Sequence, residues 1–422
     1  MSSLVSAGIL LAINLGLLWL LMAAPLGLRT ISYRRRFKTD PDTLWQAVHP
    51  LGSHADWSPS ILASARVEGE YPHVRQSLTY PDRKGRPIVR LLRVMDAVRD
   101  GASHAFRSTV VEDSALDRSY WRDYTETRSI AKAADGTELT VEVTDRYRGF
   151  AMFLFRYFAV RRELSQLDEW VRTGHPKTGG FFEHPLTQIA SATLSTLLLW
   201  PFFGLTEVGM LLSWLLTIVI VLHEAGHILA YRAFGHKSAR LIFVPLLGGL
   251  AIGGRPYNSL FEVATCALMG PGLSAFLVPI AIGVHELALD GLLPTILVKS
   301  SLLFMLVLGG FNLLNLLPMS RFDGGQVLRQ VFPSRKLQIA ASFGITAIIL
   351  LIGWRIGVPT AGLQAGLAVF TLMSLIGTAR VKPREALDPM TPPERLAAGF
   401  GLYAAIAIHG YAIVYATDAF FH

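Results

Sequence analysis

The sequence predicts a polytopic α-helical membrane protein with an inserted soluble α+β domain. Of its 422 residues, 51% are hydrophobic, and the mean hydropathy of +0.41 is too high for an ordinary soluble protein. The charges are unevenly distributed, because residues 28–185 hold 46 of the 70 charged side chains. A polar domain is therefore joined to an apolar body that crosses a membrane.

The net charge of +8 does not indicate a nucleic-acid partner. Within residues 28–185 the 25 basic side chains are nearly balanced by 21 acidic ones, and the remaining excess lies in short loops between apolar segments. The single cysteine, Cys266, lies in an apolar segment, which excludes a disulfide framework and a cysteine-based metal site. Any metal must be held by histidines and carboxylates.

Apolar stretches of about 20 residues, the length needed to cross a bilayer, predict about eight spans. They are residues 4–28, 186–204, 207–231, 259–284, 292–318, 338–358, 359–379 and 396–417. The first lacks a positive n-region and is followed by a cluster of basic residues, so we interpret it as a retained anchor (residues 1–28) with its N-terminus outside.

Basic residues in the loops predict the topology. The loops at 232–255, 321–336 and 380–395 each hold four Lys or Arg, whereas the opposite loops hold only Arg355. The basic side is the cytoplasmic one. With its several spans, the chain is expected to be an integral multi-pass protein, of the cell membrane if it is bacterial. The predicted parts are a cytoplasmic domain (32–173), a linker (174–185), a membrane core (186–380) and a C-terminal loop with the last span (381–422).

The soluble domain contains alternating stretches typical of strands between two helical segments. A helix over Asp40–His49 comes first, then strands such as 88–98 and 105–111, then a helical segment over Phe155–Val171. This element order resembles the START-like, or polyketide-cyclase-like, helix-grip fold. The resemblance implies an apolar cavity under the long helix and a hydrophobic ligand or regulatory protein as partner; a packed domain without a ligand is the alternative.

The chemistry is concentrated in the third apolar segment, which contains His223-Glu224-Ala225-Gly226-His227. Positions i and i+4 lie on one helix face, so both imidazoles can reach one metal ion, and the Glu beside the first His can take a proton from water. Ionisable groups inside a span are costly and indicate a function. Asp323, which follows the end of a later span and Pro318, is the candidate third ligand at a similar depth.

These motifs resemble the site-2 protease family of intramembrane zinc metalloproteases, over about residues 186–380. Asn315, Pro318 and Asp323-Gly324 match the family's second motif, and Gly270-Pro271 its intervening Gly-Pro pair; Ser320, Phe322 and Ser274 depart from the pattern without touching a metal ligand. The resemblance implies one Zn²⁺ per chain held by His223, His227 and Asp323, with Glu224 as the catalytic acid/base. It also implies a membrane-anchored protein as substrate and Asn315 as a substrate contact.

The stretch Leu241–Gly254 is apolar but too short and too glycine-rich for a span, so we expect a re-entrant hairpin. Its Gly248 and Gly249 would then offer a strand edge to an extended substrate; a simple membrane-dipping loop is the alternative.

Two other functions remain to be tested against intramembrane proteolysis. One is a catalytically silent membrane scaffold or lipid sensor that retains the motif. The other is a metal transporter, which is disfavoured because its polar groups should span the full membrane depth rather than gather near one face.

Overall fold

The computed structural model describes residues 16, 19–20, 23–68, 73–82, 85–100, 103–175, 184–244, 248–319, 322–375 and 386–421. Most of the predicted first anchor, most of the linker 174–185, Ser320 and the end of the segment 359–379 lie outside the described residues. The chain divides into two compact units, one formed by Met1–Gly180 with Ile376–Ala386 and the other by Phe181–Leu375 with Leu387–His422.

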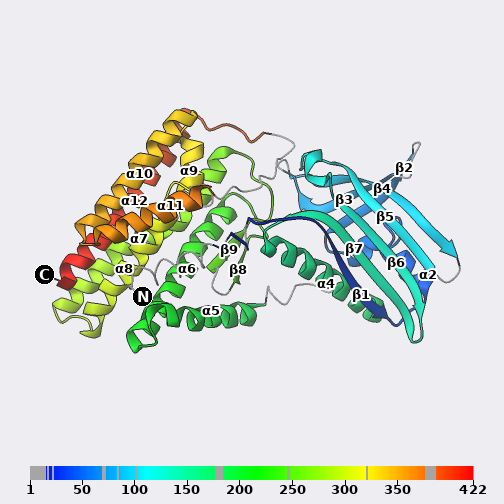
Figure 1. Cartoon of the computed structure of the whole chain (residues 1–422), viewed down its shortest axis with the longest axis horizontal. Helices are drawn as coiled ribbons and strands as arrows, with labels where there is room; N and C mark the ends of the chain where they lie inside the picture. The colour runs from blue at the N-terminus through cyan, green and yellow to red at the C-terminus, as the bar shows by residue number, and fades with distance from the viewer. Residues whose placement is uncertain are drawn as a thin grey trace. The chain divides into compact units, whose positions relative to one another are not determined.

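The first unit is a seven-stranded antiparallel sheet with a long helix (Figure 1). The strands follow one another in the order β1-β7-β6-β5-β4-β3-β2, so that only β1 leaves the sequential meander to pair with β7. The elements are β1 (Pro25–Phe37), α2 (Pro41–Val48), α3 (His54–Trp57), β2 (Ile61–Val67), β3 (His73–Pro81), β4 (Pro87–Asp100), β5 (Ser103–Asp113), η1 (Arg118–Trp121), β6 (Thr125–Ala133), β7 (Gly136–Arg148) and α4 (Phe150–Thr173).

The predicted order of early helix, strand meander and long closing helix is confirmed, with one correction at its start. Residues 25–28, assigned from the sequence to the first apolar segment, lie in β1, where Pro25 is paired with Arg148 and Leu28 with Arg146. Hydropathy alone could not separate them from the segment before, because the pairing that makes them a strand comes from residues more than a hundred positions later.

Local contacts explain where α2 begins and where α4 ends. Asp40 caps α2 by accepting a hydrogen bond from the Thr43 amide at 2.8 Å, and Pro41 stands at the first helical position, where its missing N–H costs nothing. Gly174 ends α4 in the left-handed conformation (φ 70°) that glycine adopts without strain. The core lies between the sheet and α4, where Phe106, Ile130 and Leu164 are almost fully buried.

A buried ionic cluster interrupts this apolar core. Arg128 of β6 donates hydrogen bonds to Glu126 at 2.7 Å and to Glu163 of α4 at 2.6 Å, and His54 lies 3.9 Å from Glu163. Burial, together with the Arg128 charge, lowers the pKa of His54 to about 3, so His54 is neutral in the folded domain.

This pKa predicts an acid-sensitive fold. Below pH 6.5 an unfolded His54 takes up a proton that the folded one does not bind until about pH 3, so stability falls as the pH drops through that window. His54→Gln should reduce the fall, measured as the unfolding midpoint against pH, whereas His175→Gln, at an exposed position, should leave it unchanged. Identical pH profiles for all three proteins would contradict the assignment.

The second unit is a helical bundle with one small hairpin (Figure 1). Within it, α7 packs against α6, α8, α9 and α12. Its elements are α5 (Pro185–Leu199), η3 (Trp200–Phe203), α6 (Glu207–Ala233), β8 (Arg240–Val244), β9 (Gly248–Ile252), α7 (Leu260–Leu289), α8 (Ile296–Asn315), α9 (Asp323–Val331), α10 (Arg335–Arg355), α11 (Thr360–Leu375) and α12 (Pro392–Phe421).

Among the described residues, five helices are long and apolar enough to cross a membrane: α6, α7, α8, α10 and α12. The helix α5 has 15 residues, fewer than the roughly 20 needed for a span, which corrects the predicted span 186–204. The predicted first span lies largely, and the predicted span 359–379 partly, outside the described residues, so both stay predictions. Five such helices are compatible with a membrane protein.

Candidate active site

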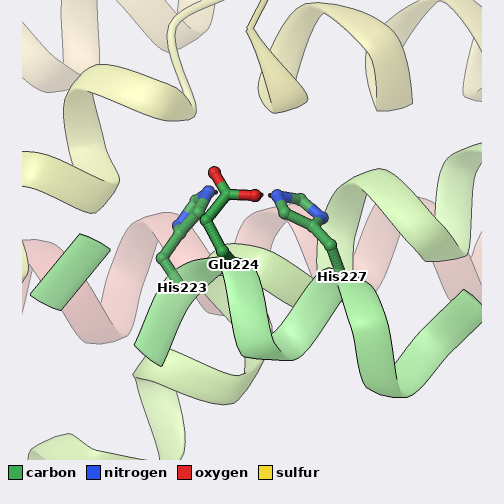
Figure 2. Close-up of side chains that lie close together, drawn as sticks. All are labelled: His223, Glu224 and His227. Atoms are coloured by element: carbon green, nitrogen blue, oxygen red, sulfur yellow. Dashed lines mark hydrogen bonds between the residues drawn. The ribbon is translucent and has the colours of Figure 1, made fainter. Parts of the chain in front are cut away.

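The helix α6 brings the two histidines of the sequence motif together. Thr206 caps this helix by accepting from the Gly209 amide, and 27 residues follow without interruption, so positions 223 and 227 lie one turn apart on the same face. The two Nε2 atoms lie 3.1 Å from each other, and His223 is buried. Figure 2 shows both imidazoles and the Glu224 carboxylate rising from one side of α6.

Partners on other helices fix the orientation and protonation of both rings. His227 Nδ1 lies 2.7 Å from the Cys266 carbonyl oxygen on α7, which can only accept, so Nδ1 carries the proton. His223 Nδ1 lies 2.8 Å from the Asn312 Oδ1 on α8, and the Asn312 amide nitrogen donates to the Leu308 carbonyl, which leaves its oxygen for the histidine. In the neutral rings this leaves Nε2 as the nitrogen available to a metal, and both Nε2 atoms are directed at a common point.

Asp323 completes this arrangement from the first turn of α9. Its Oδ2 lies 3.1 Å from His223 Nε2 and 3.4 Å from His227 Nε2, and the residue is buried. A tight turn makes this approach possible: a Cβ on Gly324 would stand 1.9 Å from the Leu316 carbonyl oxygen, and a Cβ on Gly325 would stand 1.9 Å from that of Met319. The sequence Asp-Gly-Gly is thus required by the backbone as well as by the carboxylate.

The geometry of this set fits a zinc ion. Donor atoms on adjacent corners of a tetrahedron lie about 3.3 Å apart when the bonds to zinc are about 2.0–2.1 Å, close to the three distances among His223 Nε2, His227 Nε2 and Asp323 Oδ2. Three protein donors leave a fourth position open, as in catalytic zinc sites. Ligand atoms of His223, Glu224 and His227 also lie within 4.8 Å of one another, so a set containing Glu224 could hold a metal as well.

Glu224 is held by the hairpin. Its Oε2 accepts a hydrogen bond from the Ala251 amide of β9 at 2.9 Å. Strands β8 and β9 pair antiparallel, which confirms that the stretch forms a hairpin, while its re-entry into a membrane stays a prediction. The Ala251 N–H donates to Glu224 and not to β8. The edge of β9 that does not pair with β8, its free edge, therefore runs beside Glu224 on α6.

The close approach of β9 requires glycine at position 249. A Cβ there would stand 2.3 Å from Glu224 Cγ and 3.0 Å from Cδ. We expect Gly249→Ala to displace the Glu224 carboxylate and to lower any Glu224-dependent rate by about 10-fold to 100-fold, since misplacement of a catalytic group by about 1 Å can cost about 100-fold. Zinc content should stay stoichiometric; a variant with the full rate would show that β9 does not set the position of Glu224.

The helix α7 forms the wall above the histidines. A Cβ on Gly270 would stand 2.5 Å from His227 Nε2 and 2.7 Å from His223 Nε2, so only glycine fits beside the two nitrogens. The next residue, Pro271, accepts a hydrogen bond from His409 Nε2 of α12 at 2.9 Å, and His409 is fully buried. The sequence does not indicate a partner for His409. In the structure its partner is this carbonyl, next to the candidate site.

The structure brings some of the sequence-predicted residues together and not others. His223, His227, Asp323 and Glu224 converge, and Gly249 contacts Glu224. Asn315 instead donates its amide to the Phe311 carbonyl of its own helix. The residue that holds His223 is Asn312, which was not among the sequence-predicted residues; an asparagine within an apolar segment was the available signal.

Comparison with known proteins gives limited similarity. No family model matches the chain. The zinc metalloprotease MJ0392 of Methanocaldococcus jannaschii is 30% identical over 151 residues, which are 33% of this chain and 41% of that protein. The chain therefore matches about two-fifths of the length of this relative. That relative is a zinc metalloprotease, and the donor set found at α6 consists of residue types that can hold zinc.

Solved structures are similar to about a third of the chain. A protein of Arthrobacter aurescens is 13% identical with a TM-score of 0.29, covering 37% of this chain and 93% of that one. Ara h 8.0201 is 16% identical with a TM-score of 0.27, covering 35% and 97%, and the Aha1 dimer of Colwellia psychrerythraea is 12% identical with a TM-score of 0.26, covering 35% and 98%. The fold of the soluble domain is defined by its own strand order and closing helix.

Proposed function

We propose that this chain is an intramembrane zinc metalloprotease of the site-2 protease type, which hydrolyses peptide bonds of membrane-anchored proteins. The observation that carries the proposal is the convergence of His223 Nε2, His227 Nε2 and Asp323 Oδ2 within 3.4 Å, with Glu224 beside them on α6. The likeness to a zinc metalloprotease supports the same reaction class.

The residues of the site divide the reaction among them. His223, His227 and Asp323 would hold one Zn²⁺, which supplies Lewis-acid activation of water and of the peptide carbonyl. Glu224 takes the proton of the attacking water and passes it to the leaving amine nitrogen. Asn312 and the Cys266 carbonyl keep both imidazoles in the tautomer that presents Nε2.

The substrate must present an extended segment to this site. A transmembrane helix hides its carbonyls in its own hydrogen bonds, so it must unwind locally before a peptide bond is accessible. The free edge of β9, with Gly248 and Gly249, would hold that segment by β-augmentation. Cleavage should accordingly favour sequences with helix-breaking residues.

The soluble domain would lie on the cytoplasmic side and regulate access or recruit substrates. The excess of basic residues in the loops on that side supports this topology. We propose a hydrophobic ligand or a regulatory protein as its partner, and no nucleic acid.

The test is cleavage of a panel of membrane-anchored candidates in cells by wild type and by Glu224→Gln. The variant should lose activity by about 100-fold or more, because it lacks the proton acceptor. Glu207→Gln, at the exposed start of the same helix, is the matched control and should cut normally. If wild type and Glu224→Gln give identical fragments across the panel, the chain is a silent scaffold or lipid sensor and the proposal fails.

A further inference from the structure

The first half of α4 exposes a row of large apolar side chains. Phe150, Met152, Phe155 and Phe158 are 41%, 40%, 66% and 41% exposed. Met152, Phe155 and Phe158 follow one another at intervals of three, so they lie along one side of the helix. A cluster of this size on a soluble domain marks a surface that contacts a partner or a membrane. We refer to Met152, Phe155 and Phe158 as the aromatic face of α4; Phe150 stands just before this row, at the start of the helix.

The aromatic face begins where the apolar N-terminal segment joins the sheet. The Gly149 amide, directly before Phe150, donates to the Ala24 carbonyl at 2.8 Å. The Ala23 and Ala24 amides in turn donate to the Trp19 carbonyl, and Trp19 and Leu20 are helical with about 45% exposure each. Two exposed apolar surfaces therefore meet within one unit of the chain.

Basic residues border the aromatic face, and acidic ones are missing from it. Residues 150–162 of α4 contain three arginines and no acid, the first acidic residue of the helix being Glu163. Of the three, Arg156 pairs with Asp145 of β7 at 3.4 Å. Arg148, Arg161 and Arg162 are exposed. Exposed aromatic side chains beside arginines are typical of a helix that lies in the membrane interface and contacts anionic headgroups.

We propose that the aromatic face of α4 lies in the lipid–water interface, with its aromatic rings among the acyl chains and the flanking arginines in the headgroup layer. Trp19 belongs to the same interface, where tryptophan is enriched at the ends of apolar segments. The contact would fix the soluble domain against the bilayer at the base of α4. It depends on the chain being in a membrane, as the proposed function does, but not on peptide hydrolysis.

The experiment uses the full chain in nanodiscs of mixed phosphatidylcholine and phosphatidylglycerol. An environment-sensitive fluorophore is attached at Phe155→Cys, and the matched control is Arg172→Cys, exposed on the same helix about 25 Å further along. The single native cysteine, Cys266, is buried, and labelling of the unmodified chain gives its background. Lipids carrying a nitroxide just below the headgroup serve as the quencher, and Met152→Cys provides a second position on the same face.

Contact with lipid predicts that nitroxide lipids lower the fluorescence at positions 155 and 152 by roughly half or more, and leave position 172 unchanged. Emission typical of water at both 155 and 152 would overturn the proposal. A shielded fluorophore that nitroxide lipids do not quench would also overturn it, because protein and not lipid would then cover the face. The same measurement is made on chains that also carry Glu224→Gln. Lipid contact should be unchanged in them, which keeps this result separate from the test of proteolysis.

Discussion

Alanine at position 270 should abolish tight zinc binding. The added Cβ would stand 2.5 Å from His227 Nε2 and 2.7 Å from His223 Nε2, which is closer than any real carbon contact and directly beside the two lone pairs. The rings cannot rotate away without losing their bonds to the Cys266 carbonyl and Asn312. We expect the affinity for zinc to fall by about 100-fold, as for other changes that misorient ligands, measured by competition with a chromophoric chelator.

Gly272→Ala is the matched control for this experiment. It lies two residues away in the same helix, where the nearest atom to an added Cβ is Met269 Sδ at 3.7 Å, an ordinary contact. Both substitutions change helix propensity in the same way. Equal zinc affinity for the Gly270→Ala and Gly272→Ala proteins would show that the wall of α7 does not border the metal.

A second pair of substitutions distinguishes between the two sets of metal ligands that the geometry allows. If the ligands are His223, His227 and Asp323, then Asp323→Asn should lose stoichiometric zinc, because an amide is a much weaker ligand than a carboxylate. Glu224→Gln should keep the metal, since Glu224 only moves protons. The zinc content of both purified proteins, measured by mass spectrometry of the metal, gives the comparison directly.

The opposite pattern would assign the third ligand differently. Zinc retained by Asp323→Asn and lost by Glu224→Gln would make the donor set His223, Glu224 and His227, which also lie within reach of one ion. The proposed proton transfer would then have no base. Asn315→Ala should leave zinc content unchanged in either case, because Asn315 bonds within its own helix.

The fold could be predicted from the sequence where the signal was local. Strand alternation, the early helix at 40–49 and the glycine-rich hairpin all depend on neighbouring residues, and each led to the correct element. The identity of β1 could not be predicted in this way, because its pairing partner β7 lies more than a hundred residues away. The span predicted at 186–204 was too long for a related reason, since hydropathy does not show where the helix α5 ends.

The candidate site divides in the same manner. The spacing of His223 and His227 on one helix fixes their shared face, and the depth of Asp323 after Pro318 brought it into the predicted set. Asn312, the Cys266 carbonyl and His409 act across helices, so their contacts depend on how α6, α7, α8 and α12 rotate against one another. Sequence spacing does not encode that rotation. The close approach of Gly270 to the two histidines depends on it and could not be predicted.

The most direct test of a zinc-dependent peptidase is hydrolysis by the purified chain of a candidate from the panel, in water enriched in heavy oxygen. We predict one heavy oxygen in the new C-terminal carboxylate of the product, formed by wild type with zinc and not by Glu224→Gln or after chelation. A fragment formed equally by wild type, Glu224→Gln and chelated protein would contradict the account.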